Sequence, residues 1–208
     1  MIRPLSWALP LLLTASWGAD TFLSDMRKAD SRDEPEEKIV YYSRAINDWS
    51  ASHGNALLGH CHFGRGEAYY AQGQFDLGAP DLSKAIQFDP GNARAYFLRG
   101  KAFLKMGKHA EAARDFSDFS SAGESPEGYW SLGRAYEKMG RPLDSAKAYR
   151  RAAQMAPDDF HPPLGLAGIL ISQKKWAQAL KHLERAGALA SHRSPEVLTQ
   201  AGRCKAAL

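Results

Sequence analysis

The chain has 208 residues, of which 44% are hydrophobic and 24% are charged, and this balance is typical of a soluble globular protein with enough apolar content for a continuous core. Five tryptophans, eight tyrosines and the lack of any low-complexity tract argue against a disordered chain. The formal net charge is +4, but lysines and arginines are interspersed with acids and form no contiguous basic run, which argues against a nucleic-acid partner.

Residues 1–18 have the layout of a secretory signal peptide. One positive charge, Arg3, precedes an apolar run from Leu5 to about Ala15, and small residues follow at Gly18 and Ala19. This run is shorter than the roughly 20 residues that a membrane-spanning helix needs. We therefore expect cleavage after Gly18 or Ala19 and a periplasmic or secreted, cell-envelope location. The alternatives are an uncleaved membrane anchor and a flexible N-terminus.

Residues 19–58 are predicted to form a degenerate helix pair followed by a loop. A short first helix is expected from Thr21 to Lys28, and Asp33-Glu34-Pro35 is a helix-start signal for the second. Trp49–Asn55 is expected to be a loop. The apolar positions that predict the second helix are Ile39, Tyr42, Ala45 and Ile46.

Residues 59–92 are predicted to form two short helices joined by a turn at Gly73. The second helix should end at Asp89-Pro90, because proline disfavours helix in the preceding residue and donates no backbone hydrogen bond. Neither helix can bury its apolar stripe alone. The first stripe comprises Phe63, Gly66, Tyr69 and Tyr70, and the second comprises Leu77, Leu82, Ala85 and Ile86.

The same unit recurs along the chain, and a stack of such units predicts one elongated domain. The expected repeats are residues 59–92, 93–125, 126–159 and 160–193, followed by a capping helix at residues 194–208. In this helix Leu198, Gly202 and Cys204 are in register with the preceding units, and it should cover the apolar face left by Trp176, Leu180 and Leu183. The small residues that mark the register recur at a nearly constant interval, and they are Gly66, Gly100, Gly133 and Ala167.

The third unit carries the clearest pattern, with Leu132-Gly133, Tyr136, Tyr149, Ala152 and Pro157 at their expected places. This pattern resembles the tetratricopeptide repeat (TPR) family, a helix-turn-helix unit of about 34 residues. With the N-terminal segment, the chain is similar to an exported bacterial protein of that family. The resemblance implies an all-α fold, an α-solenoid of stacked antiparallel helix pairs.

Three residues depart from the family pattern. Arg65 and Arg99 stand where a leucine is expected, and Phe119 replaces the small residue that lets one repeat approach the next. Because overpacking costs roughly 1 to 3 kcal/mol unless the backbone yields, we expect the junction after Phe119 to be repacked or slightly splayed.

The resemblance also implies a concave groove, lined by the first helix of each repeat, that holds a peptide or a partner's helix. The stripe facing it should be aromatic and mostly basic, and should turn apolar at Leu164, Gly168 and Ile171. The chaperone-binding clamp of that family is not carried over, because Phe63 and Glu67 occupy its Lys and Asn positions. The candidate groove residues are Phe63, Tyr70, Arg94, Phe97, Lys101, Lys105, Trp130, Arg134 and Lys138.

No catalytic, cofactor-binding or metal-binding residues are predicted. His60 and His62 lie about 200° apart on a helix and cannot face one ion. No phosphate-binding glycine loop and no nucleophile with a recognisable base occurs. Cys61 and Cys204 stand at positions where other repeats have small residues, so both should be buried thiols.

These observations favour a non-catalytic protein–protein interaction scaffold, exported to the cell envelope, that binds a peptide or protein partner with acidic and apolar residues. No small-molecule substrate or nucleic acid is expected, and membrane contact is expected only through an uncleaved N-terminal segment. The alternative is a self-associating structural subunit or a membrane-anchored assembly or secretion factor. The remaining alternative is an enzyme.

Overall fold

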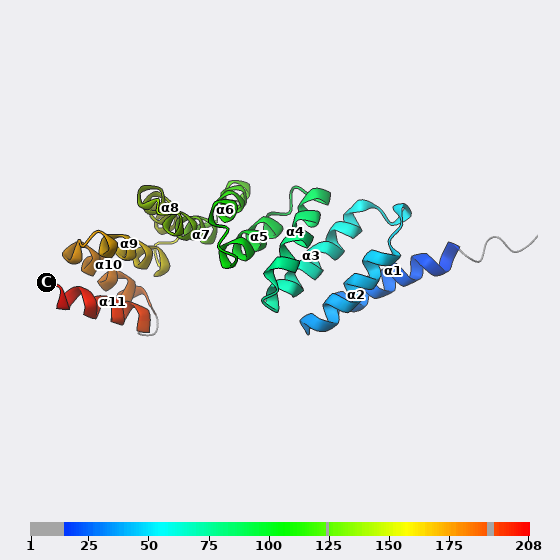
Figure 1. The fold of residues 1–208 in the computed structure, drawn as a ribbon, viewed down its shortest axis with the longest axis horizontal. Helices are drawn as coiled ribbons and strands as arrows, with labels where there is room; N and C mark the ends of the chain where they lie inside the picture. The colour runs from blue at the N-terminus through cyan, green and yellow to red at the C-terminus, as the bar shows by residue number, and fades with distance from the viewer. Residues whose placement is uncertain (1–14, 124, 191–193) are drawn as a thin grey trace, which may run out of the picture. The chain divides into compact units, whose positions relative to one another are not determined.

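The computed structural model describes residues 15–123, 125–190 and 194–208, with side chains from residue 21 onward (Figure 1). Residues 1–14 of the predicted signal segment lie outside this described part. The described residues contain α-helices, one short 3₁₀ helix and no strand, so the predicted all-α class is confirmed. Contacts group the chain into two compact units, Met1–Pro90 and Gly91–Leu208.

The first unit contains two antiparallel helix pairs. Its helices are α1 (Ala15–Asp30), α2 (Pro35–Asp48), α3 (Asn55–Ala71) and α4 (Phe75–Phe88), with the 3₁₀ helix η1 (Ala51–His53) between α2 and α3. The first helix is longer than the predicted Thr21–Lys28. Tyr42 and Ala45 are buried as expected, and they form a core with Phe22, Ala29 and Cys61.

The segment between α2 and α3 is ordered by its own side chains. Ser50 and His53 form a reciprocal capping box around η1, in which the backbone N–H of Ser50 donates to His53 Nδ1 at 2.9 Å. Trp49 Nε1 donates to the carbonyl of Gly54, and the His53 ring stacks on Phe22 with centroids 4.4 Å apart. The predicted loop is therefore an ordered, compact connection, and α3 begins at its last residue, Asn55.

The second unit continues the same helix-pair pattern. In the described residues, three clusters of buried alanine, leucine and aromatic side chains follow one another through these helices. The helices of this unit are α5 (Ala93–Lys105), α6 (His109–Gly123), α7 (Pro126–Lys138), α8 (Pro142–Met155), α9 (His161–Ser172), α10 (Trp176–Leu189) and α11 (Pro195–Ala206).

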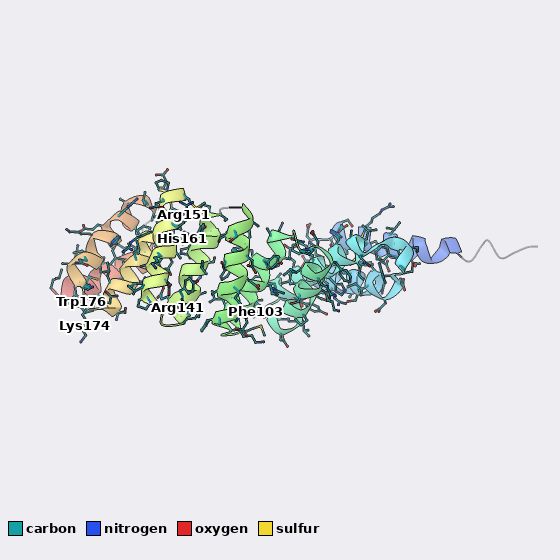
Figure 2. The ribbon with its side chains drawn as sticks, turned by 90° about the horizontal axis from the view of Figure 1, so that it is seen from above. Phe103, Arg141, Arg151, His161, Lys174 and Trp176 are labelled. Carbon is teal, nitrogen blue, oxygen red and sulfur yellow. The ribbon has the colours of Figure 1, made fainter. Side chains whose placement is uncertain are left out.

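Each described helix pair from α3 to α10 turns at a residue with positive φ. Three of these residues are glycines, which adopt this conformation at low cost, and the fourth is Lys174 at φ 58° (Figure 2). A left-handed conformation costs a non-glycine residue roughly 1 to 2 kcal/mol. The turn before α10 therefore has the same left-handed geometry as the other three turns, although a lysine disfavours that conformation.

Two buried ion pairs explain the arginines that depart from the family pattern. Arg65 pairs with Asp81 through two contacts of 2.7 and 2.8 Å, and Arg99 pairs with Asp115 at 2.9 and 2.8 Å. Each arginine lies on the first helix of a pair and its aspartate on the second. In the α7–α8 pair, Leu132 and the small Ala148 fill the corresponding positions.

The two aspartates differ in their pKa directions because they have different partners. Burial alone would raise the pKa of Asp81, but hydrogen bonds from Arg65 and from His62, at 2.8 Å, hold that pKa below its ordinary value. Burial raises the pKa of Asp115, because Arg99 offsets only part of the desolvation. Asp81 is consequently the better-stabilised carboxylate.

The junction after Phe119 is repacked rather than splayed. The Phe119 ring packs on Phe97 with centroids 4.7 Å apart, and the first turn of α7 presents Gly128 to the same ring. A Cβ at Gly128 would lie 2.7 Å from Phe119, so the missing side chain provides the space that phenylalanine takes up. A large residue on α6 is thus matched by glycine on α7.

Some residues placed on the predicted apolar stripes are exposed rather than packed. Leu77 and Leu198 are 49% and 54% exposed, and Gly202 has no neighbour within 4 Å of a built Cβ. On α11 the buried residues are Val197 and Cys204, which pack with Leu183. The short, small-residue helices leave more than one stripe compatible with a 3.6-residue period, and the partner helix decides between them.

Both cysteines are buried free thiols, as predicted. Cys61 lies in the core of the first unit, and Cys204 lies against α10. Burial, with a further contribution from Asp30, raises the pKa of the Cys61 thiol to about 12. A thiol with this pKa carries almost no thiolate at neutral pH and is a poor nucleophile.

Candidate functional site

Helices α7, α9 and α11 line a groove of about 480 Å³ in the second unit. We call it the first-helix groove, because its walls are the first helices of successive pairs. Its floor is the side chain of Tyr149, which comes from α8 behind them. The residues that line it are Trp130, Arg134, Glu137, Lys138, Tyr149, Phe160, His161, Leu164, Gly165, Gly168, Ser194, Glu196 and Gln200.

Tyr149 fixes the spacing of the two helices that flank it. Its ring is 1% exposed and lies between glycines on α7 and α9, where a Cβ at Gly133 or Gly165 would come within 2.6 Å of the ring. Its hydroxyl donates to Glu137 Oε2 at 2.9 Å. Burial, and then the nearby Glu137 carboxylate, raises the pKa of this phenol above its ordinary value. The floor of the groove is therefore a neutral, immobile ring.

One wall of the groove is aromatic. The Trp130 ring meets the His161 ring at a centroid distance of 4.9 Å, and His161 also stacks on Phe160 at 4.0 Å. His161 is held in turn by Asp159, through its backbone N–H at 2.9 Å and its Nδ1 at 2.6 Å. Asp159 thus accepts a hydrogen bond from the first backbone N–H of α9.

The charges around the groove are mixed. Arg134 and Lys138 lie one turn apart on α7, with the Arg134 guanidinium 5.1 Å from the centre of the Trp130 ring. Glu137 and Glu196 also line the groove. Glu196 comes from α11, which was expected only to cap the stack, so the charge of this groove does not come from the predicted stripe alone.

The structure brings three of the nine predicted groove residues into this groove, namely Trp130, Arg134 and Lys138. Leu164 and Gly168 line it as well, which agrees with the predicted apolar end. Ile171 instead packs into the cluster beside α10 and α11. The groove therefore begins at the third expected repeat.

Four predicted residues lie on α5 and do not line this groove. Phe97 is half-buried against Phe116 and Phe119, at centroid distances of 5.8 and 4.7 Å. Lys101 lies over the Phe97 ring at 5.2 Å. Arg94 and Lys105 are exposed. The α5 stripe is thus an aromatic packing surface with a basic outer edge.

The remaining two predicted residues, Phe63 and Tyr70, belong to α3 in the first unit. Both are half-buried, and the Tyr70 ring packs on Phe75 with centroids 5.2 Å apart. Burial raises the pKa of the Tyr70 phenol. Tyr70 therefore helps to hold α3 against α4.

Sequence reasoning missed the contributions of His161, Phe160 and α11. His161 stands one repeat after Glu127, so extending the groove stripe by one turn at its start would have found it. Glu196 stands at the same register position one repeat later, six residues before Gly202, whereas no sequence signal of this kind marks Gln200. Their place in the groove depends on how α11 packs against α10.

His60 and His62 turn to different partners, Asp30 and Asp81, as their helical spacing predicts. Over the part of the chain that the structure describes, no cluster of three His, Cys, Asp or Glu side chains is arranged to hold a metal ion. In that same part, none of the helices combines the length and apolar character needed to cross a membrane.

Stacked helix pairs with an open groove of aromatic and charged side chains define a helical-repeat protein of the protein-interaction class. The TPR repeat family model matches residues 66–107, and the tetratricopeptide repeat model matches residues 136–199. Together these matches span about half of the chain. The chain belongs to the tetratricopeptide repeat family.

Curated relatives share this repeat region within much longer proteins. The chain is 30% identical over 127 residues to the human zinc finger CCCH domain-containing protein 7B, covering 58% of this chain and 13% of that protein. It is 30% identical over 153 residues to the tetratricopeptide repeat and J domain-containing co-chaperone DNJ1 of Fusarium oxysporum f. sp. lycopersici, covering 69% of this chain and 28% of that protein. The chain therefore spans less than a third of either relative.

Two solved structures have a similar fold. A crystal structure of MamA protein superposes with a TM-score of 0.73 at 17% identity, covering 82% of this chain and 92% of that one. YrrB, described as a TPR protein with an unusual peptide-binding site, superposes with a TM-score of 0.73 at 14% identity, covering 89% of this chain and 90% of that one. At these identities the likeness concerns the fold.

Proposed function

We propose that this protein is a non-catalytic scaffold that binds a protein or peptide partner in the first-helix groove. The observation that carries the proposal is the Trp130–His161–Phe160 wall beside Arg134 and Lys138, above the fixed ring of Tyr149. Aromatic side chains with an arginine at their edge are the groups that most often dominate binding energy at protein interfaces. The peptide-binding site named for YrrB supports this use of the fold.

The groove favours a segment with an apolar side chain beside an acidic one. The apolar side chain would lie against Trp130 and Leu164, and its neighbouring carboxylate would lie toward Arg134 and Lys138. Glu196, on the α11 wall, would repel a second carboxylate placed on that side. The position of the acid relative to the apolar residue is therefore part of the specificity.

The test starts with the native partner, captured by a photo-crosslinking residue in place of Lys138 and then titrated against purified variants. Trp130→Ala should weaken binding about 30-fold at any salt concentration, because truncating a buried aromatic anchor typically costs roughly 2 kcal/mol. Arg134→Glu combined with Lys138→Glu should mainly slow association and flatten its salt dependence.

Arg94→Ala provides the control, because Arg94 is exposed on α5 and does not line the groove. Its affinity should match that of the wild type. If Trp130→Ala binds as tightly as the wild type while substitutions on α8 or α10 weaken binding, the first-helix groove is not the binding site.

We also propose that the protein is exported to the cell envelope and that residues 1–18 are its signal peptide. The support is the charge and hydrophobicity layout of that segment. Phe22 and Ala29, which pack into the core of the first unit, follow the expected cleavage point and would stay in the mature chain. Mass spectrometry of an envelope fraction should find a chain shorter by about 18 or 19 residues. A full-length cytoplasmic species would contradict export.

A further inference from the structure

A second groove, of about 440 Å³, lies on the other side of α9, between α8 and α10. We call it the second-helix groove. Its floor is apolar and includes Leu143, Leu166 and Ile169, of which Leu143 is 77% exposed. Its rim carries Arg150, Lys175 and Lys181. No carboxylate is among the described side chains that line it.

A similar groove occurs one repeat earlier, lined by α6, the end of α7 and Arg141, and provides an internal comparison. It has a similar volume, about 470 Å³, but its lining combines two cations, Arg114 and Arg141, with the carboxylate of Asp118. Arg141 stands one repeat before Lys175, and it is neutralised by Asp144, with Nη2–Oδ2 and Nε–Oδ2 distances of 2.8 and 2.9 Å. Asp118 also lines this earlier groove.

The acids of the earlier repeat are missing at the matching positions, and Arg151 stands where that repeat has Asp118. Gln178 stands where the earlier repeat has Asp144, and Arg150 stands where it has Ser117. Leu143, which is exposed, stands where the earlier repeat has Ala110. The later groove therefore gains apolar surface and positive charge at once, and no carboxylate of its own lining balances that charge.

We propose that the second-helix groove binds an acidic amphipathic segment of a partner protein, with a large apolar side chain on the floor and carboxylates at the rim. The three rim cations come from α8, from the residue before α10 and from α10 itself. They surround the apolar floor, so several carboxylates are needed to neutralise them, and a peptide segment carries several. A fatty acid carries only one carboxylate and could not neutralise all three cations.

His182 reports on occupancy of this groove. Burial, together with Arg185 and Arg150, lowers the pKa of the imidazole, and the α9 side chains beside the groove are apolar. Bound carboxylates would oppose the field of Arg150 and the rim lysines, so they would raise the pKa of His182. Binding would then take up protons. The affinity would therefore increase as the pH falls toward the pKa that His182 has in the unbound protein.

The probe is a short fluorescein-labelled peptide with leucines and glutamates at helical spacing, measured by fluorescence anisotropy against its glutamine counterpart. The wild type should bind the glutamate peptide more tightly, and NMR titration of His182 with that peptide should show a raised pKa. Gln178→Asp restores the acid of the earlier repeat, and Arg150→Ser restores its serine. Each should weaken binding about two- to fivefold, as expected for an exposed charge pair.

Both substituted positions are exposed, and circular dichroism would check that the variants fold. Lys138→Gln, in the first-helix groove, is the matched control and should leave the affinity for this peptide unchanged. Equal binding of the two peptides would overturn the proposal. A loss caused by Trp130→Ala but not by Gln178→Asp would also overturn it, as would binding to phosphatidylserine vesicles without binding to the peptide.

Discussion

The α1–α2–α3 junction and the α7–α8–α9 junction use the same device with different outcomes. In each, a buried tyrosine on the middle helix donates its hydroxyl to an acid on the preceding helix, at 2.6 Å for Tyr42 to Asp30 and 2.9 Å for Tyr149 to Glu137. In each, the tyrosine ring lies against a glycine of the third helix, Gly64 or Gly165. A histidine stands one helical turn before each glycine.

The two histidines turn to different partners. His60 Nε2 reaches Asp30 at 2.8 Å, so the acid bonded to Tyr42 is also bonded to the third helix. His161 instead bonds to Asp159, beside its own helix start, and leaves Glu137 on the wall of an open groove. We call the first junction closed, because a side chain of the third helix bridges to its acid, and the second open, because its acid lines a groove.

The start of the third helix accounts for this difference. The two connections, residues 49–54 and 156–160, are nearly equal in length, but α3 begins nine residues before Gly64 and α9 begins four residues before Gly165. His60 therefore lies inside α3, and the helix fixes its direction. His161 is the first residue of α9, where Asp159 can hold it. The length of a first helix can thus decide which partner this histidine reaches.

The largest expected effect comes from filling the space beside either tyrosine. Gly64→Ala and Gly165→Ala place a Cβ in collision with the ring of Tyr42 or Tyr149. Both rings are buried, so each substitution should lower the free energy of unfolding by about 1 to 3 kcal/mol. Urea denaturation of each variant would measure the loss.

Gly202→Ala is the control for these two variants, because Gly202 is also inside a helix and has no atom within 4 Å of a built Cβ. It should be neutral or more stable by up to about 1 kcal/mol, since alanine is the better helix former. A full-sized loss at Gly64 with none at Gly165 would show that only the closed junction requires this contact.

A smaller effect is expected on removing the tyrosine hydroxyls. Tyr42→Phe and Tyr149→Phe should each cost about 1 kcal/mol at neutral pH, the net contribution of a typical hydrogen bond. Burial, with the adjacent carboxylate, raises the pKa of both phenols above the ordinary value near 10.

The raised pKa values also predict how the two variants respond to alkaline pH. Above about pH 10 the unfolded tyrosine loses a proton that the folded one keeps, so wild-type stability should fall as the pH rises further. Each phenylalanine variant should lose stability less steeply over that range. Urea denaturation between neutral pH and pH 11 would measure both slopes, and parallel slopes for wild type and variants would contradict the assignment.

The smallest effect is expected for His60→Ala, which removes the side chain that closes the first junction. His60 and Asp30 are both substantially exposed, so their pair should contribute about 0 to 1 kcal/mol. Thermal unfolding should hardly change, although Asp30 loses its hydrogen bond to the third helix. A loss as large as that of Gly64→Ala would mean that the histidine holds the junction together rather than covering it.

Much of the repeat architecture follows from the sequence alone. The spacing of Gly66, Gly100 and Gly133 predicts helix pairs, and the match of Tyr42 to Tyr149 predicts that both lie on a second helix. Trp130 and Arg134 fall on the groove stripe by the same register. These features are local, because burial on a helix repeats with the helix period and small residues mark where helices approach closely.

Other features depend on which side chains meet between helices, and only the tertiary structure decided them. The sequence shows Arg65 at a leucine position, but Asp81 as its partner emerges only when α3 lies against α4. The partner of His161 and the position of α11 along the first-helix groove were also decided by contacts that only the tertiary structure shows. Helix periodicity specifies which face of a helix is buried, whereas a side chain's partner depends on where its helix begins and on the neighbouring helix, neither of which is contained in the period.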